Sequence, residues 1–192
     1  MASSIARPTG SGPGLELARL ARIARSTGEA VTLGVRSREI ALYVAQRDGS
    51  HNILSVGDWV GRSTTLPSTA TGKVLLAFSD GHAPGRRERH TAHTIVRPTH
   101  LKEELERTRR RGFGLMRDEL EEGLSAAAAP VYDTVGTCVA AVAVSGPSFR
   151  LAGSLTALGG QCVDAADEIT RAFADGRRVA ATDNRQQSAS TD

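Results

Sequence analysis

The sequence predicts an α+β fold in which an antiparallel sheet packs against helices. Residues 125–147 show the pattern of two short strands joined by a turn at residues 133–136. Residues 151–173 carry apolar side chains at intervals of three and four, which form one stripe along a long C-terminal helix. The other predicted strands also follow one another as hairpins rather than through regular crossovers, so we expect the sheet to be antiparallel.

The remaining elements follow in chain order. Residues 15–26 have apolar residues at helical spacing and Gly28 follows them, which predicts a first helix. Strands are predicted at 30–35, 39–46 and 52–56, and a helix at 69–78 with Ser68 as its N-cap. A surface helix at 101–111, which Gly112 ends, leads through a short strand and an acidic loop at 118–122 to the hairpin.

One folded domain is predicted between two tails. Residues 1–14 are rich in Ser, Gly and Pro, which is typical of a flexible linker. Residues 175–192 are polar and aperiodic, which predicts a disordered tail. The folded domain is therefore expected at residues 15–174.

The composition supports a globular core and excludes several classes of protein. Hydrophobic residues make up 40% and charged residues 23% of the 192 residues, which is sufficient for a core. The net charge of +3 is too small to predict a nucleic-acid-binding face. No run reaches the roughly 18 apolar residues of a membrane span, and two isolated cysteines give no disulfide framework or zinc motif. We expect a reduced, cytoplasmic protein with no cofactor and no membrane contact.

The second strand of the hairpin has two different faces. Side chains alternate along a strand, so Ala141, Ala143 and Ser145 share one face, whereas Val142 and Val144 lie on the other. The small side chains leave space above the sheet, which either a closely packed helix or a ligand has to fill. Because the C-terminal helix can cover the valines, we favour the small face as the wall of a ligand pocket.

The helix predicted after Ser68 offers a site for an anion. The first N–H groups of a helix lack intrahelical partners and lie at the positive end of the helix dipole, so a carboxylate can bind there without Arg or Lys. Ala70 and Gly72 keep the entrance small, and Thr69 and Thr71 add hydroxyl groups. An ordinary capped helix in close packing explains the same residues, and both interpretations stay open at this point.

A phosphate-binding loop and a metal site fit the sequence poorly. Thr71-Gly72-Lys73 resembles the end of a phosphate-binding loop, but Pro67 and Val74 stand where the motif requires Gly and Ser or Thr. The histidines at positions 82, 90, 93 and 100 lie in a polar, Arg-rich segment, and we interpret them as solvated. No metal site is therefore expected.

Catalytic nucleophiles are equally weakly supported. Ser145 could form a Ser/His/Asp triad only without the GxSxG elbow that exposes such a serine. Cys138 and Cys162 lack neighbouring charges that would activate a thiolate. The acidic residues at 118–122 are interpreted as a solvated loop rather than a cation site. We therefore expect that the chain is not an enzyme.

Four segments carry a resemblance to a known family, in the order in which that family has them. They are LARLARIARSTGEAVTLGV (17–35), LPSTATGKVLLAF (66–78), HLKEELERTRRRGFG (100–114) and DELEEGLSAAAAPVYDTVGTCVAAVAVSGP (118–147). They cover the folded region, and the last of them is the most specific. In these segments the chain resembles the C-terminal effector-binding domain of the IclR family of bacterial transcription regulators.

The resemblance implies a GAF-like α+β domain that binds a small organic effector, often a carboxylate or an aromatic acid, and that forms a homodimer or tetramer. The positions that it implies as ligand-binding are Ala70, Thr71, Met116, Leu124, Ala126, Ala143 and Ser145. Many members have His in place of Pro67, Cys near Ala126 and an acidic residue near Met116. The pocket is therefore expected to be less polar here, and its effector more apolar.

The resemblance also implies where DNA would be bound. The family places a winged helix-turn-helix before this domain, and the 14 residues that precede the first predicted helix are too few to form one. DNA binding is therefore expected only through a domain that is not in this chain.

Three hypotheses about function follow. The leading one is a small-molecule sensing domain of a transcription regulator, which controls DNA binding or oligomer state. The alternative is a freestanding ligand-binding module that acts through protein partners, and an in-frame helix-turn-helix upstream would distinguish the two. A small hydrolase is the third, and it predicts turnover that is lost in Ser145→Ala.

Overall fold

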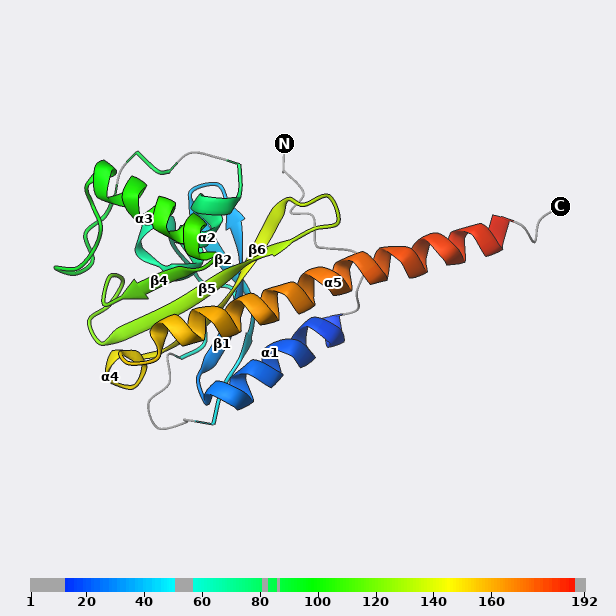
Figure 1. The fold of residues 1–192 in the computed structure, drawn as a ribbon, viewed down its shortest axis with the longest axis horizontal. Helices are drawn as coiled ribbons and strands as arrows, with labels where there is room; N and C mark the ends of the chain where they lie inside the picture. Colours follow the sequence, from blue (N-terminus) through cyan, green and yellow to red (C-terminus); the bar gives the residue numbers. More distant parts are fainter. Residues whose placement is uncertain (1–12, 51–56, 81–82, 86, 189–192) are drawn as a thin grey trace.

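A six-stranded sheet forms the centre of the molecule (Figure 1), shown here by a computed structural model that describes residues 13–50, 57–80, 83–85 and 87–188. The strand order is β3-β2-β1-β6-β5-β4, and every neighbouring pair is antiparallel. The strands are β1 (Ala30–Ser37), β2 (Ile40–Arg47), β3 (Ser63–Thr65), β4 (Gly114–Arg117), β5 (Leu124–Tyr132) and β6 (Cys138–Pro147). The predicted α+β class with an antiparallel sheet is confirmed.

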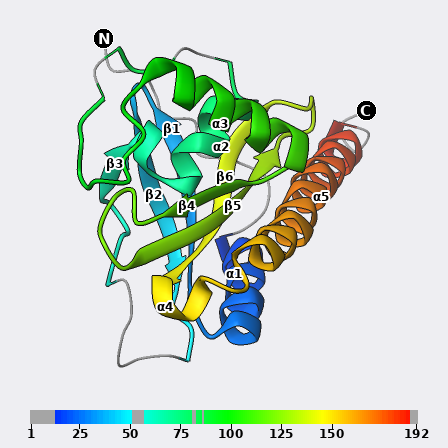
Figure 2. The same cartoon turned by 60° about the vertical axis from the view of Figure 1, so that its left-hand side comes forward.

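Two helices cover one face of the sheet and bury its larger side chains. They are α1 (Pro13–Thr27) and α5 (Leu155–Ser188), which lie side by side (Figure 2). Val142 and Val144 of β6 are fully buried in one apolar cluster with Leu158 and Ile169 of α5. The valine face of the hairpin therefore packs against the C-terminal helix, as the alternation of side chains predicts.

The small side chains of β6 face two other helices. These are α2 (Ala70–Phe78) and α3 (Pro98–Arg111), and Ala141 and Ala143 share an apolar cluster with Val74 of α2 and Leu101 of α3. At Gly114 of β4 an added Cβ would lie 2.8 Å from the Ala70 carbonyl oxygen, so α2 approaches the sheet very closely. The close packing of α2 therefore requires small residues over much of this face of the sheet.

The strand registers align side chains from several strands in rows. Ser145 pairs with Ala126 on one side and with Ala30 on the other, and Ala126 pairs with Met116. In the next row along, Ala143 pairs with Thr32 of β1. Residues 116, 126 and 145, which are distant in sequence, therefore lie side by side across β4, β5 and β6.

The structure differs from the sequence prediction at the start of α2. Leu66–Ser68 form a 3-10 turn, and the N-cap of α2 is Thr69 rather than Ser68. The Thr69 hydroxyl accepts a hydrogen bond from the Gly72 amide at 2.9 Å. Ser is on average the better N-cap and Thr is also a common one, so the sequence favoured Ser68, whereas the 3-10 turn places Thr69 at the cap. The third predicted strand, at 52–56, lies outside the described residues, and the described strand after β2 is β3.

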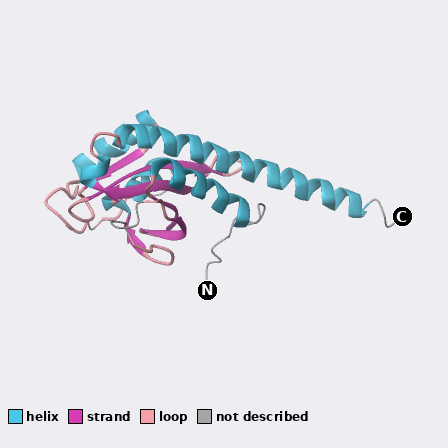
Figure 3. Ribbon diagram, turned by 90° about the horizontal axis from the view of Figure 1, so that it is seen from below, coloured by secondary structure: helices cyan, strands magenta, loops and turns pink. Residues whose placement is uncertain are grey.

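The C-terminal helix also has different limits. A short helix, α4 (Ser148–Leu151), precedes α5, and α5 continues through Ser188, well past the sheet (Figure 3). The helical segment therefore includes most of residues 175–192, for which we expected a disordered tail. Ala, Arg and Gln residues are frequent in that stretch, and they have high helix propensity. Among the helices that the structure describes, none has the length and apolar character needed to cross a bilayer.

Candidate functional site

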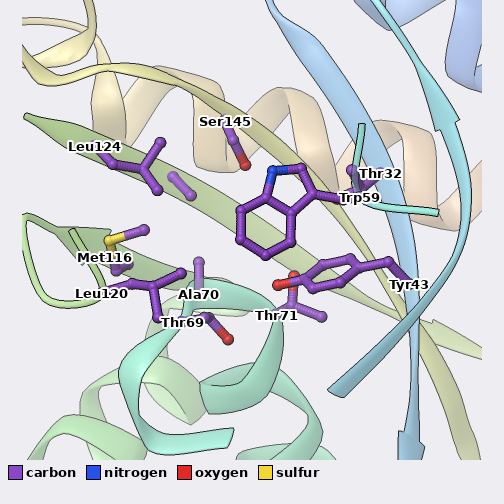
Figure 4. A pocket seen from close by; sticks show the side chains of 11 residues that line it. Thr32, Tyr43, Trp59, Thr69, Ala70, Thr71, Met116, Leu120, Leu124 and Ser145 are labelled. Carbon is purple, nitrogen blue, oxygen red and sulfur yellow. The ribbon is translucent and has the colours of Figure 1, made fainter. Parts of the chain in front are cut away.

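A small cavity lies between the start of α2 and the sheet (Figure 4). The residues that line it come from the sheet, from α2 and from two connecting segments. They are Thr32, Tyr43, Trp59, Thr69, Ala70, Thr71, Met116, Leu120, Leu124, Ala126 and Ser145. The cavity volume is about 20 Å³, and about 360 Å³ of space between atoms surrounds it when the part open to solvent is included.

The structure brings together six of the seven positions that the sequence analysis identified. Ala70 and Thr71 reach the cavity from α2, Met116 from β4, Leu124 and Ala126 from β5, and Ser145 from β6. Ala143 is the exception. It is 1% exposed and lies in the apolar cluster beneath α2, one row away from Ser145. The small face of β6 thus contacts a helix at Ala141 and Ala143 and opens to a cavity at Ser145.

Five further lining residues were not identified from the sequence as pocket positions. Thr32 lies on β1 and Tyr43 on β2, whereas Trp59 lies between β2 and β3 and Leu120 between β4 and β5. The fifth is Thr69, which the sequence analysis mentioned only for its hydroxyl group at the helix start. The alternation of β1 would have placed Thr32 on the correct face if the pairing of β1 with β6 had been known. No local pattern identifies Trp59, because its position depends on the path of a loop.

Gly34 sets the position of Thr71. The register between β1 and β2 shifts at Leu33/Gly34, which places Gly34 opposite Tyr43. A Cβ added at Gly34 would lie 2.6 Å from Thr71 Cγ2, closer than real side-chain contacts allow. The absence of a side chain at Gly34 therefore leaves room for Thr71 between the sheet and the cavity.

The start of α2 combines helix-end amides with hydroxyl groups. Thr69 accepts hydrogen bonds from the Gly72 amide through its side chain and from the Lys73 amide, at 2.9 Å, through its carbonyl. The amides of Ala70 and Thr71 therefore have no acceptor within the helix, and they carry the positive end of its dipole. Among the residues that line the cavity, Thr32, Tyr43, Thr71 and Ser145 carry hydroxyl groups. No Lys, Arg, Asp or Glu occurs among the described residues that line it.

The segment that carries Leu120 is fixed from several sides. Thr91 donates a hydrogen bond to the Asp118 carbonyl oxygen at 2.6 Å, and Thr94 donates one to the Glu119 carbonyl oxygen at 2.7 Å. The Asp118 carboxylate accepts hydrogen bonds from the Gly123 amide and from the Ser148 hydroxyl. Leu120 therefore forms a firmly held wall of the cavity.

A buried ion pair lies behind this wall. The Lys73 ammonium donates to Glu119 Oε1 at 2.5 Å and to the Leu115 carbonyl oxygen at 2.9 Å. Glu119 is only 8% exposed, so the interpretation of residues 118–122 as a solvated loop is wrong at this position. Burial raises the pKa of the Glu119 carboxyl, and the positive charge of Lys73 opposes this effect without reversing it.

The histidines do not form a cluster of metal ligands in the part of the chain that the structure describes. No group of three or more His, Cys, Asp or Glu side chains there could hold a metal ion, and His82 lies outside the described residues. The His90 ring lies 3.2 Å from the Thr65 hydroxyl. The absence of a metal site stays a prediction.

Comparisons with known proteins agree with this architecture. Residues 16–171 match the family described as "Bacterial transcriptional regulator IclR C-terminal". The chain is 39% identical over 136 residues to the glycerol operon regulatory protein of Streptomyces griseus, covering 67% of this chain and 52% of that protein. It is 35% identical over 130 residues to the HTH-type transcriptional regulator KdgR of Dickeya chrysanthemi, covering 65% of this chain and 42% of that protein. The chain thus spans about half the length of these relatives.

Solved structures give the same result for the fold. The C-terminal domain of the Escherichia coli transcriptional regulator KdgR superposes with a TM-score of 0.65 at 28% identity, covering 83% of this chain and 94% of that one. The Thermotoga maritima IclR superposes with a TM-score of 0.72 at 27% identity, covering 83% of this chain and 66% of that one. The match to a regulatory domain also supports the prediction that the chain is not an enzyme. This chain belongs to the IclR family of bacterial transcriptional regulators and contains the effector-binding C-terminal domain of that family.

Proposed function

We propose that the cavity at the start of α2 binds a small organic acid, and that this binding regulates transcription. The observation that carries the proposal is the convergence of Ala70, Thr71, Met116, Leu124, Ala126 and Ser145 on one cavity at the N-terminal end of α2. A carboxylate would accept hydrogen bonds from the amides of Ala70 and Thr71 and from nearby hydroxyl groups. Met116, Leu120 and Leu124 would contact the apolar part of the same molecule.

The charge distribution supports a weakly polar effector rather than a strongly polar one. The described lining residues carry hydroxyl groups but no charged side chain, so a second carboxylate would be buried without a cation to balance it. Monocarboxylic acids with an apolar or aromatic body therefore fit better than dicarboxylic acids. This agrees with the expectation, drawn from Pro67, Met116 and Ala126, that this pocket is less polar than those of many relatives.

The remaining partners are proposed from the family alone. In a complete regulator, DNA would be contacted by a winged helix-turn-helix domain of the kind that the family places before this one. Effector binding would alter that contact directly or through a homodimer or tetramer, and the protein would act in the cytoplasm. Light scattering and operator-binding assays, with and without effector, test this part once an effector has been found.

A thermal-shift screen over organic acids tests the proposal. A ligand at about 100 times its dissociation constant adds about 2.7 kcal/mol of stability, which raises the melting temperature by several degrees. Monocarboxylic acids should give the shifts, and calorimetry should then confirm one ligand per chain. Shifts given only by small, highly polar acids would contradict the proposed effector class.

Two substitutions test whether binding occurs in this cavity. Thr71→Val and Ser145→Ala each remove a hydroxyl group, and each should weaken binding of a confirmed acid by about tenfold or more, since a hydrogen bond to a charged group is worth about 1.5–3 kcal/mol. Ser63→Ala, on the exposed side of β3, is the matched control and should leave affinity unchanged. Unchanged affinity in both cavity variants would place the ligand elsewhere.

A further inference from the structure

The cavity is almost completely filled by the protein's own side chains. Its volume of about 20 Å³ is sufficient for about one water molecule. An organic acid with an apolar body is much larger than water, so it cannot enter unless a lining side chain moves. The surrounding space of about 360 Å³ falls within the range of small-molecule sites, but only part of it is enclosed.

Most of the lining side chains are poorly placed to move. Ala70, Thr71, Met116 and Tyr43 are between 0% and 7% exposed and lie on α2 or on strands. Moving them would disturb the packing of the sheet against α2. Trp59 and Leu120 differ, because both are half-buried and lie outside the helices and strands. Of the two, Trp59 has the larger side chain, and Leu120 belongs to the segment that Thr91 and Thr94 hold.

The backbone of Trp59 is fixed independently of its side chain. Its amide donates a hydrogen bond to the Gln46 side chain at 2.9 Å, and its carbonyl oxygen accepts one from the Arg62 amide at 2.9 Å. Gln46 also donates to the Gly57 carbonyl oxygen at 2.8 Å, so one buried amide side chain holds both ends of the short segment 57–59. A change in the side-chain torsions of Trp59 therefore requires no displacement of its backbone.

The indole ring occupies the space that an effector would need. It projects toward the centre of the lining side chains, between Ser145 and Thr71 (Figure 4). Its ring packs edge-on against Tyr43, with 5.4 Å between centroids, and the Arg62 guanidinium lies 6.0 Å from its centre. These aromatic and cation–π contacts are each worth about 1 kcal/mol, and a ligand that displaces the ring has to replace them together with the other interactions of the residue.

We infer that Trp59 fills the ligand site in the unliganded protein, and that an effector enters by displacing the indole ring. Trp59 thereby sets the smallest apolar body that can compete for the site, and it is a specificity-determining residue. The identity of the displacing ligand rests on the function proposed above, whereas the occupation of the cavity by the indole ring does not.

The first experiment removes the indole side chain of Trp59 and adds free indole in its place. Trp59→Gly should leave a cavity of indole shape, and apolar cavities of this kind bind the missing group. Saturating indole should raise the melting temperature of Trp59→Gly by at least roughly 2–4 °C, whereas wild type and the matched variant Trp59→Phe should not respond. An indole shift that is absent from Trp59→Gly, or equal in all three proteins, would overturn the inference.

The affinity of Trp59→Gly for acids distinguishes displacement of the indole ring from direct stacking of an acid on that ring. Any acid from the screen that binds wild type should bind Trp59→Gly at least about tenfold more tightly, because no ring has to leave. Weaker binding by Trp59→Gly would mean that Trp59 is a contact wall, and it would overturn the inference. If no acid binds either protein while indole still stabilises Trp59→Gly, the proposed effector class fails and the occupation of the cavity by Trp59 stands.

The wild-type protein provides a measurement that needs no variant. Trp59 is the single tryptophan of the chain, so all tryptophan fluorescence reports on it. Its emission should be partly protected from acrylamide in the free protein, and a bound acid should increase quenching as the ring moves outward. Quenching in the free native protein as efficient as in the unfolded chain would overturn the inference even if Trp59→Gly does not fold.

Discussion

The Lys73 ammonium lies 2.5 Å from Glu119 Oε1, and the two side chains are 1% and 10% exposed. The pair joins the second turn of α2 to the segment that carries Leu120, and it therefore connects two walls of the cavity. Both charges have lost most of their contact with water. Such a pair holds its neighbours in place but adds little net stability, because desolvation offsets the attraction.

Removing one member of this pair should be more harmful than removing both. Lys73→Met leaves the Glu119 carboxylate buried without its cation and should lower the free energy of unfolding by about 3–5 kcal/mol. The double variant Lys73→Met/Glu119→Met replaces both charges by apolar groups and should recover most of that loss. Urea unfolding of wild type, both single variants and the double variant measures the coupling. Additive losses would show that the two residues do not interact.

Glu119 should make stability fall as the pH rises. Burial raises the pKa of the Glu119 carboxyl above its ordinary value of 4.5, so between these two pKa values the folded state binds the proton more tightly than the unfolded state does. The stabilising contribution is complete below about pH 4.5 and is lost as the pH rises through the folded pKa. The unfolding free energy of wild type minus that of Glu119→Gln should therefore become smaller as the pH rises over that interval. A difference that stays constant or increases would contradict the raised pKa.

Glu104, on the neighbouring helix α3, should show the opposite behaviour. Desolvation alone would raise its pKa, but the charges of Lys73 and Arg111 and the hydrogen bonds from Arg111 and Arg107 lower it in total. Its stabilising contribution is present above pH 4.5 and is lost as the pH falls through the folded pKa. Wild type should therefore lose stability in acid relative to Glu104→Gln. Acid unfolding monitored by circular dichroism checks the direction.

Prediction from the sequence failed at residues whose surroundings depend on segments that are distant in the chain. Glu119 belongs to an acidic run that is solvated in isolation, and it is buried because Lys73, 46 positions earlier in the chain, reaches it. Ala143 was placed on the correct face by alternation, but alternation cannot show that α2 covers this position while Ser145 is left at a cavity. Trp59 reaches the same cavity only through the path of the chain between β2 and β3.

Local patterns were sufficient where one element decides the outcome. The stripe of apolar residues along the C-terminal helix and the alternation of β6 were enough to predict which face of the sheet α5 covers. Gly112 ends α3 with a left-handed φ of 81°, as its position after the apolar and charged repeat indicates. Of the six cavity positions, Met116, Leu124 and Ala126 came only from the resemblance to a family, whereas local patterns also indicated Ala70, Thr71 and Ser145.

Gly72 should tolerate no side chain. An added Cβ would lie 1.9 Å from the Leu66 carbonyl oxygen, which is a backbone atom and cannot move without disturbing the 3-10 turn before α2. Gly72→Ala should therefore destabilise the protein by about 2 kcal/mol or more. The matched control is Gly160→Ala, which lies exposed on α5 with nothing within 4 Å of the new Cβ and should stabilise by up to about 1 kcal/mol. Equal effects of the two substitutions would show that α2 does not pack against the turn in this way.

The two cysteines should be unreactive in the native protein. Cys162 lies on α5 and is fully buried against the sheet, with its thiol 3.4 Å from the Ala127 carbonyl oxygen, and Cys138 is 5% exposed. Burial raises the pKa of Cys162 to about 12 and that of Cys138 to about 11, so almost no thiolate is present at neutral pH. The thiolate is the reactive species, and a thiol reagent should therefore label neither residue until the protein unfolds in guanidinium, when both react. Rapid labelling of Cys162 in the folded protein would show that the α5 face of the sheet opens far more readily than its packing implies, and rapid labelling of Cys138 would show the same for the α2 face.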